Sequence, residues 1–99
     1  MNNILITGGA GSVGRALTKS MLKHDPNTIR VLDLSENEMF KMKNEFEREK
    51  KVRYLMGDIR DINRLKLAME DIDIVVHLAA MKHVHACEYN PFEAIKTNI

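Results

Sequence analysis

The stretch Thr7–Gly14, TGGAGSVG, holds four glycines in seven residues and directly follows an apolar run. Glycine has no Cβ, so the backbone is bare at the point where the hydrophobic segment stops. The preceding residues Ile4–Thr7 are mostly β-branched, which predicts a short buried strand. From Ser12 to about Lys23, apolar residues recur at helical spacing. The stretch therefore joins a strand to a helix through a glycine-rich turn.

The same alternation of strand and helix continues along the chain. Ser35 and Glu38 have the spacing of a capping box, and Asp61 is placed as an N-cap, so each marks a helix start. The expected strands after the first are Thr28–Leu34, Val52–Asp58 and Asp73–Ala80, and the expected helices are Ser35 to about Lys50, Asp61 to about Glu70, and one opening at Asn90–Glu93.

This order predicts an α/β protein with a parallel sheet, because each crossover returns the chain in the same direction. We expect the N-terminal part of a Rossmann-type, doubly wound sheet of about four strands in the order 3-2-1-4, with helices on both faces.

Composition narrows the class of protein. The 99 residues suffice for one small domain, and a net charge of +1 gives no reason to expect nucleic acid or an anionic membrane as a partner. No apolar run approaches the ~18 residues of a membrane-spanning helix, and the N-terminus lacks a secretory signal pattern. The single Cys87 excludes an internal disulfide, which fits a cytoplasmic location.

The glycines have a chemical explanation in this context. A helix N-terminus presents unpaired N–H groups and a positive dipole end, which attract an anion such as a diphosphate. We assign Gly8 to the tight turn, Gly11 to close approach of the phosphates, and Gly14 to packing of the helix against the strand.

An acidic residue stands where a dinucleotide site needs one. Asp33 ends the second strand, 19 residues after Gly14, near the ~20 typical of the carboxylate that binds the adenosine ribose. Its charge would repel a 2′-phosphate, so it favours NAD, with NADP as the less favoured cofactor. The alternative is that Asp33 is a turn residue or helps to cap the second helix.

The ends of the next two strands also suit a ligand, because parallel sheets bind at their carboxyl ends. Asp58 could accept a hydrogen bond from the adenine amino group, and Ile59 could cover the ring. Ala79 and Ala80 would leave room for the middle of the cofactor, or would simply pack tightly.

Taken together, TGGAGSVG, the acid after strand two, GDIRD and HLAA resemble the extended short-chain dehydrogenase/reductase superfamily. The stretch Ala79–Ile99, AAMKHVHACEYNPFEAIKTNI, is similar to the inverting UDP-N-acetylglucosamine 4,6-dehydratases of polysaccharide biosynthesis. In that chemistry the nicotinamide takes a hydride from C4 of the sugar, water is lost across C5 and C6, and the hydride returns to C6.

The resemblance also implies roles for individual positions. Gly11, Ser12, Val13 and Gly14 would hold the diphosphate. The segment Asp33–Glu38, including Ser35, would surround the ribose, and Asp58 with Ile59 would surround the adenine. Leu78 and Lys82 would approach the nicotinamide, and Lys82 would also touch the UDP-sugar substrate, unless it is a solvated surface lysine. Many relatives have Ser-Arg after strand two and use NADP, whereas this chain has Asp33-Leu34-Ser35.

The catalytic groups of the family are not among these residues. The resemblance implies a catalytic Tyr-x-x-x-Lys pair. Tyr89 has no lysine four positions later, and Tyr54 falls within a strand. We therefore interpret residues 1–99 as the N-terminal portion of a dinucleotide-binding domain, inactive alone. In it the strand DIVVHL would be an open edge that invites self-association, and we expect a homo-oligomer.

Other functions are weaker. His83, His85 and Cys87, with His77 nearby, do not complete a tetrahedral metal site, so no metal is expected. Cys87 lacks an oriented base for nucleophilic catalysis, and His77 in an apolar strand is expected to be a core histidine with a partner. A nucleotide-sugar 4-epimerase and a non-catalytic dinucleotide-binding module remain alternatives to the dehydratase.

Overall fold

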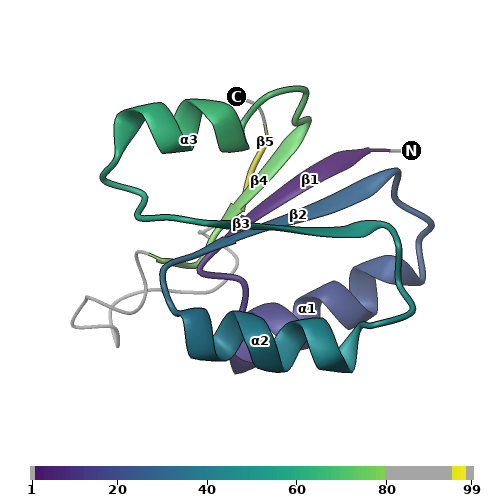
Figure 1. Ribbon diagram of the computed structural model, residues 1–99. Coiled ribbons are helices and arrows are strands. Elements are labelled where there is room, and N and C mark those ends of the chain that lie inside the picture. Colours follow the sequence, from purple (N-terminus) through teal and green to yellow (C-terminus); the bar gives the residue numbers. More distant parts are fainter. Residues whose placement is uncertain (1, 80–94, 98–99) are drawn as a thin grey trace, which may run out of the picture.

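The computed structural model describes residues 2–79 and 95–97 of the chain. They form a single twisted sheet with helices above and below it (Figure 1). In chain order the elements are β1 (Asn3–Thr7), α1 (Ser12–Leu22), β2 (Thr28–Asp33), α2 (Glu36–Glu45), β3 (Val52–Met56), α3 (Ile62–Ala68), β4 (Ile74–His77) and β5 (Ile95–Thr97).

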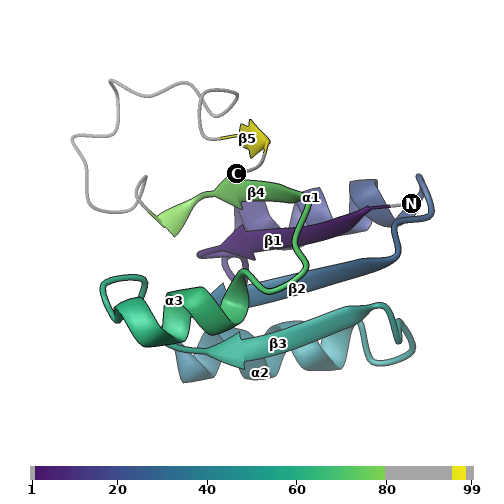
Figure 2. The ribbon, with the colours of Figure 1, turned by 90° about the horizontal axis from the view of Figure 1, so that it is seen from above.

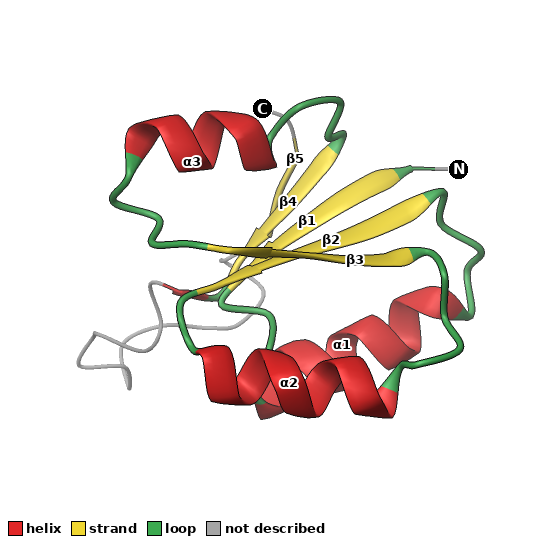
Figure 3. Ribbon diagram, in the orientation of Figure 1, coloured by secondary structure: helices red, strands yellow, loops and turns green. Residues whose placement is uncertain are grey.

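The sheet has the order β3-β2-β1-β4-β5. β1 lies in parallel between β2 and β4, with Ile4 opposite both Ile29 and Ile74. Viewed from above, β3, β2, β1 and β4 all run in the same direction (Figure 2). Helices α1 and α2 cover one face and α3 covers the other (Figure 3). The doubly wound architecture and the order 3-2-1-4 are therefore confirmed.

Two apolar layers hold the helices to the sheet. Alternate residues of a strand point to opposite faces, so Ile4 and Ile6 of β1 belong to the core on the α1–α2 side, while Leu5 belongs to the core on the α3 side. Leu5 and Ile6 are fully buried. Because both faces of β1 are covered, its sequence lacks the polar alternation of a half-exposed strand.

β5 differs from the expectation. The last helix was expected to open at Asn90–Glu93, which lies outside the described residues, but Ile95–Thr97 form a short antiparallel strand beside β4. Val75 pairs with Lys96, so the outer edge of β4, expected to be open, is covered along Ile74–Val76. The physical reason is that an open edge exposes unpaired backbone N–H and C=O groups, which bind an available extended segment. The same property led us to expect self-association through this edge.

Several elements end earlier than their sequence pattern. α2 stops at Glu45 rather than near Lys50: Phe46 is its C-cap, with the non-helical angles φ −107° and ψ 32°, and its side chain is 7% exposed in the core. α3 ends at Ala68 rather than near Glu70, and Asp71 then takes a positive φ of 61°. β4 ends at His77, short of Ala80.

Candidate dinucleotide site

The turn after β1 is built on the backbone freedom of glycine. Gly8 has a φ of +69°, and a Cβ there would lie 2.7 Å from the backbone nitrogen of Ala79. Its own N–H donates to the carbonyl of Leu32 at 2.7 Å. Gly8 thus sits between the ends of β2 and β4, as the tight turn predicted from the sequence requires.

At Gly14 the nearest atoms are not those of the strand, as expected, but those of Gly9. A Cβ on Gly14 would lie 2.1 Å from the carbonyl oxygen of Gly9. At this residue the helix therefore packs on the glycine loop, while Leu17, Met21 and Leu22 further along α1 pack on the core that contains Ile4 and Ile6 of β1. The sequence identified the need for a bare backbone at Gly14, although the atoms nearest to it belong to the loop that follows the strand.

The start of α1 is not closed by a side chain. Gly11 is the N-cap residue, in extended conformation, and it makes no side-chain capping bond. The first turn contains no acidic residue. Ser12 and Val13 are both exposed there, Val13 by 59%. The first turn of this eleven-residue helix thus carries no acidic side chain of its own, which suits an anionic group at its positive end.

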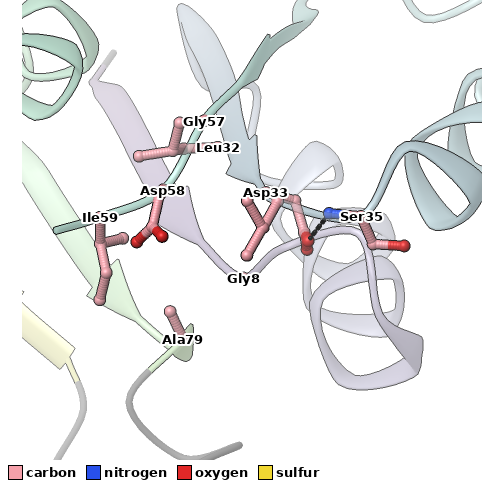
Figure 4. Close-up of a pocket in the computed structure, with 9 residues that line it drawn as sticks. Gly8, Leu32, Asp33, Ser35, Gly57, Asp58, Ile59 and Ala79 are labelled. Atoms are coloured by element: carbon pink, nitrogen blue, oxygen red, sulfur yellow. Dashed lines mark hydrogen bonds between the residues drawn. The ribbon is translucent and has the colours of Figure 1, made fainter. Parts of the chain in front are cut away.

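A cavity of about 220 Å³ lies at the carboxyl ends of the four parallel strands (Figure 4). Six of the residues predicted to bind the cofactor line it, and they come from the carboxyl ends of β1–β4 and the loops that follow them. Its lining consists of Gly8, Leu32, Asp33, Leu34, Ser35, Gly57, Asp58, Ile59 and Ala79.

Asp33, the last residue of β2, lies beside the glycine loop and is 4% exposed. Its Oδ2 accepts from the N–H of Ala10 at 2.9 Å, and its Oδ1 accepts from the N–H of Ser35 at 2.9 Å. The turn-forming role considered for Asp33 is therefore real. A carboxylate offers about four acceptor positions, so holding two amides is compatible with binding a hydroxyl donor as well.

Ser35 is the N-cap of α2, as its spacing to Glu38 predicts. Its Oγ accepts from the N–H of Glu38 at 3.2 Å. The return bond of a capping box is not made by Glu38, because the N–H of Ser35 already donates to Asp33. The Glu38 carboxylate instead contacts Arg15 at 3.1 Å and Lys41 at 3.7 Å.

Asp58 lines the cavity and is paired with Arg60. The guanidinium of Arg60 forks over the carboxylate, with Nη2 at 2.7 Å from Oδ2 and Nε at 3.1 Å from Oδ1. The hydrogen bond to Asp58, and then its negative charge, raise the pKa of Arg60 above the ordinary value. Neighbouring Ile59 packs on the α3-side core.

The remaining predicted residues fall into two groups. Leu78 is 6% exposed and belongs to the α1–α2 core, so its side chain is packed beneath the loops rather than lining the cavity. Ala80 and Lys82 lie outside the described residues, as do His83, His85 and Cys87. His77 has the partner expected of a core histidine, since its Nδ1 is 2.6 Å from Oγ1 of the buried Thr7.

Arg15 contacts the glycine loop, and the sequence analysis did not identify it. Its Nη1 donates to the carbonyl of Ala10 at 3.1 Å inside the glycine loop. The same nitrogen is 3.1 Å from Glu38, and Nε is 3.4 Å from Glu45. Its partners are 5, 23 and 30 positions away, so no local spacing in the sequence announces them.

In residues 2–79 and 95–97, no three acidic, histidine or cysteine side chains are grouped so as to hold a metal ion. The same ranges contain no helix with both the length and the apolar character needed to cross a bilayer.

Comparison with known proteins gives the site a family context. The chain is 54% identical over 96 residues to an uncharacterized membrane protein of Methanocaldococcus jannaschii. It is 51% identical over 98 residues to an inverting UDP-N-acetylglucosamine 4,6-dehydratase of Campylobacter jejuni. These matches cover 97% and 98% of this chain but only 28% and 29% of the relatives, so the chain spans less than a third of their length.

Solved structures agree with the fold. A crystal structure of Pen from Bacillus thuringiensis is 48% identical and superposes with a TM-score of 0.78, covering 94% of this chain and 29% of that one. The enzyme WbmF of Bordetella bronchiseptica, solved in complex with NAD⁺ and UDP, is 30% identical with a TM-score of 0.61, covering 78% of this chain and 22% of that one. The family profile described as polysaccharide biosynthesis protein matches residues 4–99, and the chain belongs to that family.

Proposed function

We propose that this chain is the N-terminal, NAD-binding portion of a nucleotide-sugar 4,6-dehydratase that acts on UDP-N-acetylglucosamine. The observation that carries the proposal is the cavity at the carboxyl ends of β1–β4, together with the bare glycine turn beside it. Ligands of parallel sheets bind at this place. The 51% identity to a dehydratase of that specificity supports the choice of sugar.

The residues present fit a dinucleotide. The bare backbone of Gly8 lets the turn pack directly on the backbone of Ala79, and both residues line the cavity. Gly11–Gly14 would hold the diphosphate at the start of α1, with Ser12 and Val13 beside it. Asp33 and Ser35 would hold the ribose, while Asp58 and Ile59 would lie at the adenine.

The charges around the expected ribose position favour NAD over NADP. Asp33 is followed by Glu36 and Glu38 in the first turn of α2. The guanidinium of Arg15, the cation that reaches this region from α1, is held by Glu38 and Glu45. A 2′-phosphate would therefore meet carboxylates, whose repulsion raises its binding free energy.

When bound, the nicotinamide supplies a hydride acceptor and afterwards a hydride donor for the sugar. The described part of the chain supplies binding and orientation rather than proton transfer. Tyr54 packs its ring below Lys43, and partial burial, with the charge of Glu45, raises the pKa of its phenol. A tyrosine that exchanges protons near neutral pH needs a lowered pKa. We therefore give Tyr54 no catalytic role and assign no catalytic residue in this chain. The contact with the sugar is assigned to Lys82, as the family resemblance implies.

The test uses the full-length protein and two measurements. Incubation with UDP-N-acetylglucosamine should give a product lighter by one water in mass spectrometry. Calorimetric titration should show tighter binding of NAD than of NADP. Equal or tighter binding of NADP would contradict the role given to Asp33, and a product of unchanged mass would contradict dehydration.

A 4-epimerase is the second candidate. The chain is 40% identical to a UDP-glucose 4-epimerase of Rickettsia bellii, and the match covers 97% of this chain and 29% of the epimerase. An epimerase would convert the sugar without loss of water, so the mass measurement separates the two activities, and chromatography of the sugar nucleotides identifies the epimer. Binding of NAD with neither product would instead indicate a non-catalytic module. The proposal includes a cytoplasmic homo-oligomer, which fractionation and sedimentation would test.

A further inference from the structure

Ala10 lies in the middle of the glycine loop, and charged side chains hold both of its peptide groups. Its N–H donates to Oδ2 of Asp33 at 2.9 Å in a buried hydrogen bond. Its carbonyl accepts from Nη1 of Arg15 at 3.1 Å. The residue itself is fully buried. The loop is therefore fixed at its centre by two side chains of opposite charge, one from the end of β2 and one from α1.

The Arg15 side chain also ties the loop to α2. Arg15 is the fourth residue of α1, and helical side chains lean toward the helix N-terminus, which brings its guanidinium back over the loop. There it meets Glu38 of the first turn of α2 at 3.1 Å and Glu45 of the last turn at 3.4 Å. The side chain is 24% exposed, so water screens these contacts only in part.

A cation in the first turn of a helix is unfavourable for the helix dipole. The position of Arg15 is therefore not explained by α1 alone. It is explained by the three acceptors that the guanidinium bridges, namely the Ala10 carbonyl and the two glutamates.

We propose that Arg15 is a positioning residue for the diphosphate loop. By holding the Ala10 carbonyl while Asp33 holds the Ala10 N–H, it fixes the loop in its binding shape before any ligand arrives. The inference rests on the proposed dinucleotide function for its consequence, but the loop order that it predicts is a property of the ligand-free protein. The rival explanation is that Arg15 acts as a direct cation for a phosphate.

Three variants of the full-length protein separate these explanations. Arg15→Met keeps the aliphatic stem and removes all three contacts. Arg15→Lys keeps the charge but has one ammonium in place of the fork, so it can serve only part of the network. Glu45→Gln is the matched control, because it weakens the 3.4 Å contact to Nε and leaves the bond from Nη1 to Ala10 in place.

The first measurement is hydrogen exchange of the ligand-free proteins, followed over peptides that cover residues 8–14. We expect Arg15→Met to speed exchange in the loop about 10-fold, with Arg15→Lys intermediate and Glu45→Gln close to wild type. Exchange in β2 should not change, which excludes global loosening. Unchanged loop exchange in Arg15→Met would overturn the proposal.

The second measurement is the Kd for NAD by calorimetry. Arg15→Met should raise it about 10-fold, the effect of losing one charged hydrogen bond that preorganises the site. A direct phosphate contact predicts instead that Arg15→Lys binds NAD as wild type does and that ligand-free exchange is unaffected. If wild type itself fails to bind NAD, the proposed function fails, while the exchange result still decides whether Arg15 orders the loop. If Arg15→Met does not fold, the exchange rate and Kd of Arg15→Lys decide between the two.

Discussion

At the scale of single residues, Gly8 directly follows β1 and contacts the chain near the ends of β2 and β4. There is no room for a side chain at this position. Its φ of +69° is unfavourable for any L-residue, and a Cβ would collide with the backbone of Ala79. We expect Gly8→Ala to lower the free energy of unfolding by about 2 kcal/mol or more and to weaken NAD binding, because Gly8 and Ala79, which both line the cavity, would have to move apart. Chemical denaturation and calorimetry measure the two effects.

Gly57 provides the control for this substitution, since it lines the same cavity. A Cβ there would meet the side chain of Arg64, which is exposed and can change rotamer, rather than backbone. Gly57→Ala should therefore cost about 1 kcal/mol or less. A loss for Gly8→Ala as small as the about 1 kcal/mol expected for Gly57→Ala would show that the turn at Gly8 tolerates a side chain and would count against its assigned role.

The residues that the sequence could predict are those whose role leaves a local pattern. Gly8 and Ser35 follow from their positions at a strand end and a helix start, and Asp33 follows from its distance to the glycines. Arg15 could not be found in this way, because its contacts depend on how α1 and α2 pack. The pairing of Asp58 with Arg60 is local, but a D-x-R spacing is too common to have predicted it.

At the scale of elements, α3 has only seven residues and is held by side chains at both ends. Oδ1 of Asp61 accepts from the N–H of Arg64 at 3.2 Å at its start. At its end, Nη1 of Arg30 in β2 donates to the carbonyls of Ala68 at 2.6 Å and Glu70 at 3.0 Å. A helix of two turns is marginal without such contacts, because its terminal backbone groups have no partners within the helix.

We expect Asp61→Ala to cost about 1 kcal/mol of unfolding free energy, the usual effect of losing an N-cap. Arg30→Met should cost roughly 1–2 kcal/mol, since it removes a cation and two hydrogen bonds from the negative end of the helix. Thermal unfolding followed by circular dichroism measures both.

Arg53 gives the matched control for Arg30, because it is its register partner in β3 and is exposed. Arg53→Met should change the unfolding free energy by no more than about 0.5 kcal/mol. A loss as large as that of Arg30→Met would mean that charge on this face of the sheet, rather than capping of α3, is what matters.

The sequence predicted the starts of the helices better than their ends. Asp61 and Ser35 mark starts through side chains that bond within the next three residues. α2 ends where Phe46 leaves helical geometry, while the charged pattern of the sequence continues past it. The end of α3 depends on Arg30, which is 38 positions from Ala68, so no local signal exists for it.

At the scale of the whole molecule, the two edges of the sheet are unequal. β3 forms one edge, and at the other β5 covers β4 with only three residues. β1 is paired on both sides and covered on both faces. Stability against local opening should therefore fall from β1 toward β5, because edge pairs have fewer packed neighbours to break.

The last prediction uses this inequality in the 99-residue chain. Lys96→Pro removes a backbone donor and disfavours the strand where Lys96 pairs with Val75, whereas Lys96→Ala keeps the backbone intact. We expect the proline variant to speed hydrogen exchange in Ile74–Val76 without changing β1, and to increase association in sedimentation as protein concentration rises, since the uncovered edge can pair with a second copy. Exchange in β4 that is the same in the proline and alanine variants would show that β5 does not protect it, and the edge of β4 would then be open as the sequence alone suggested.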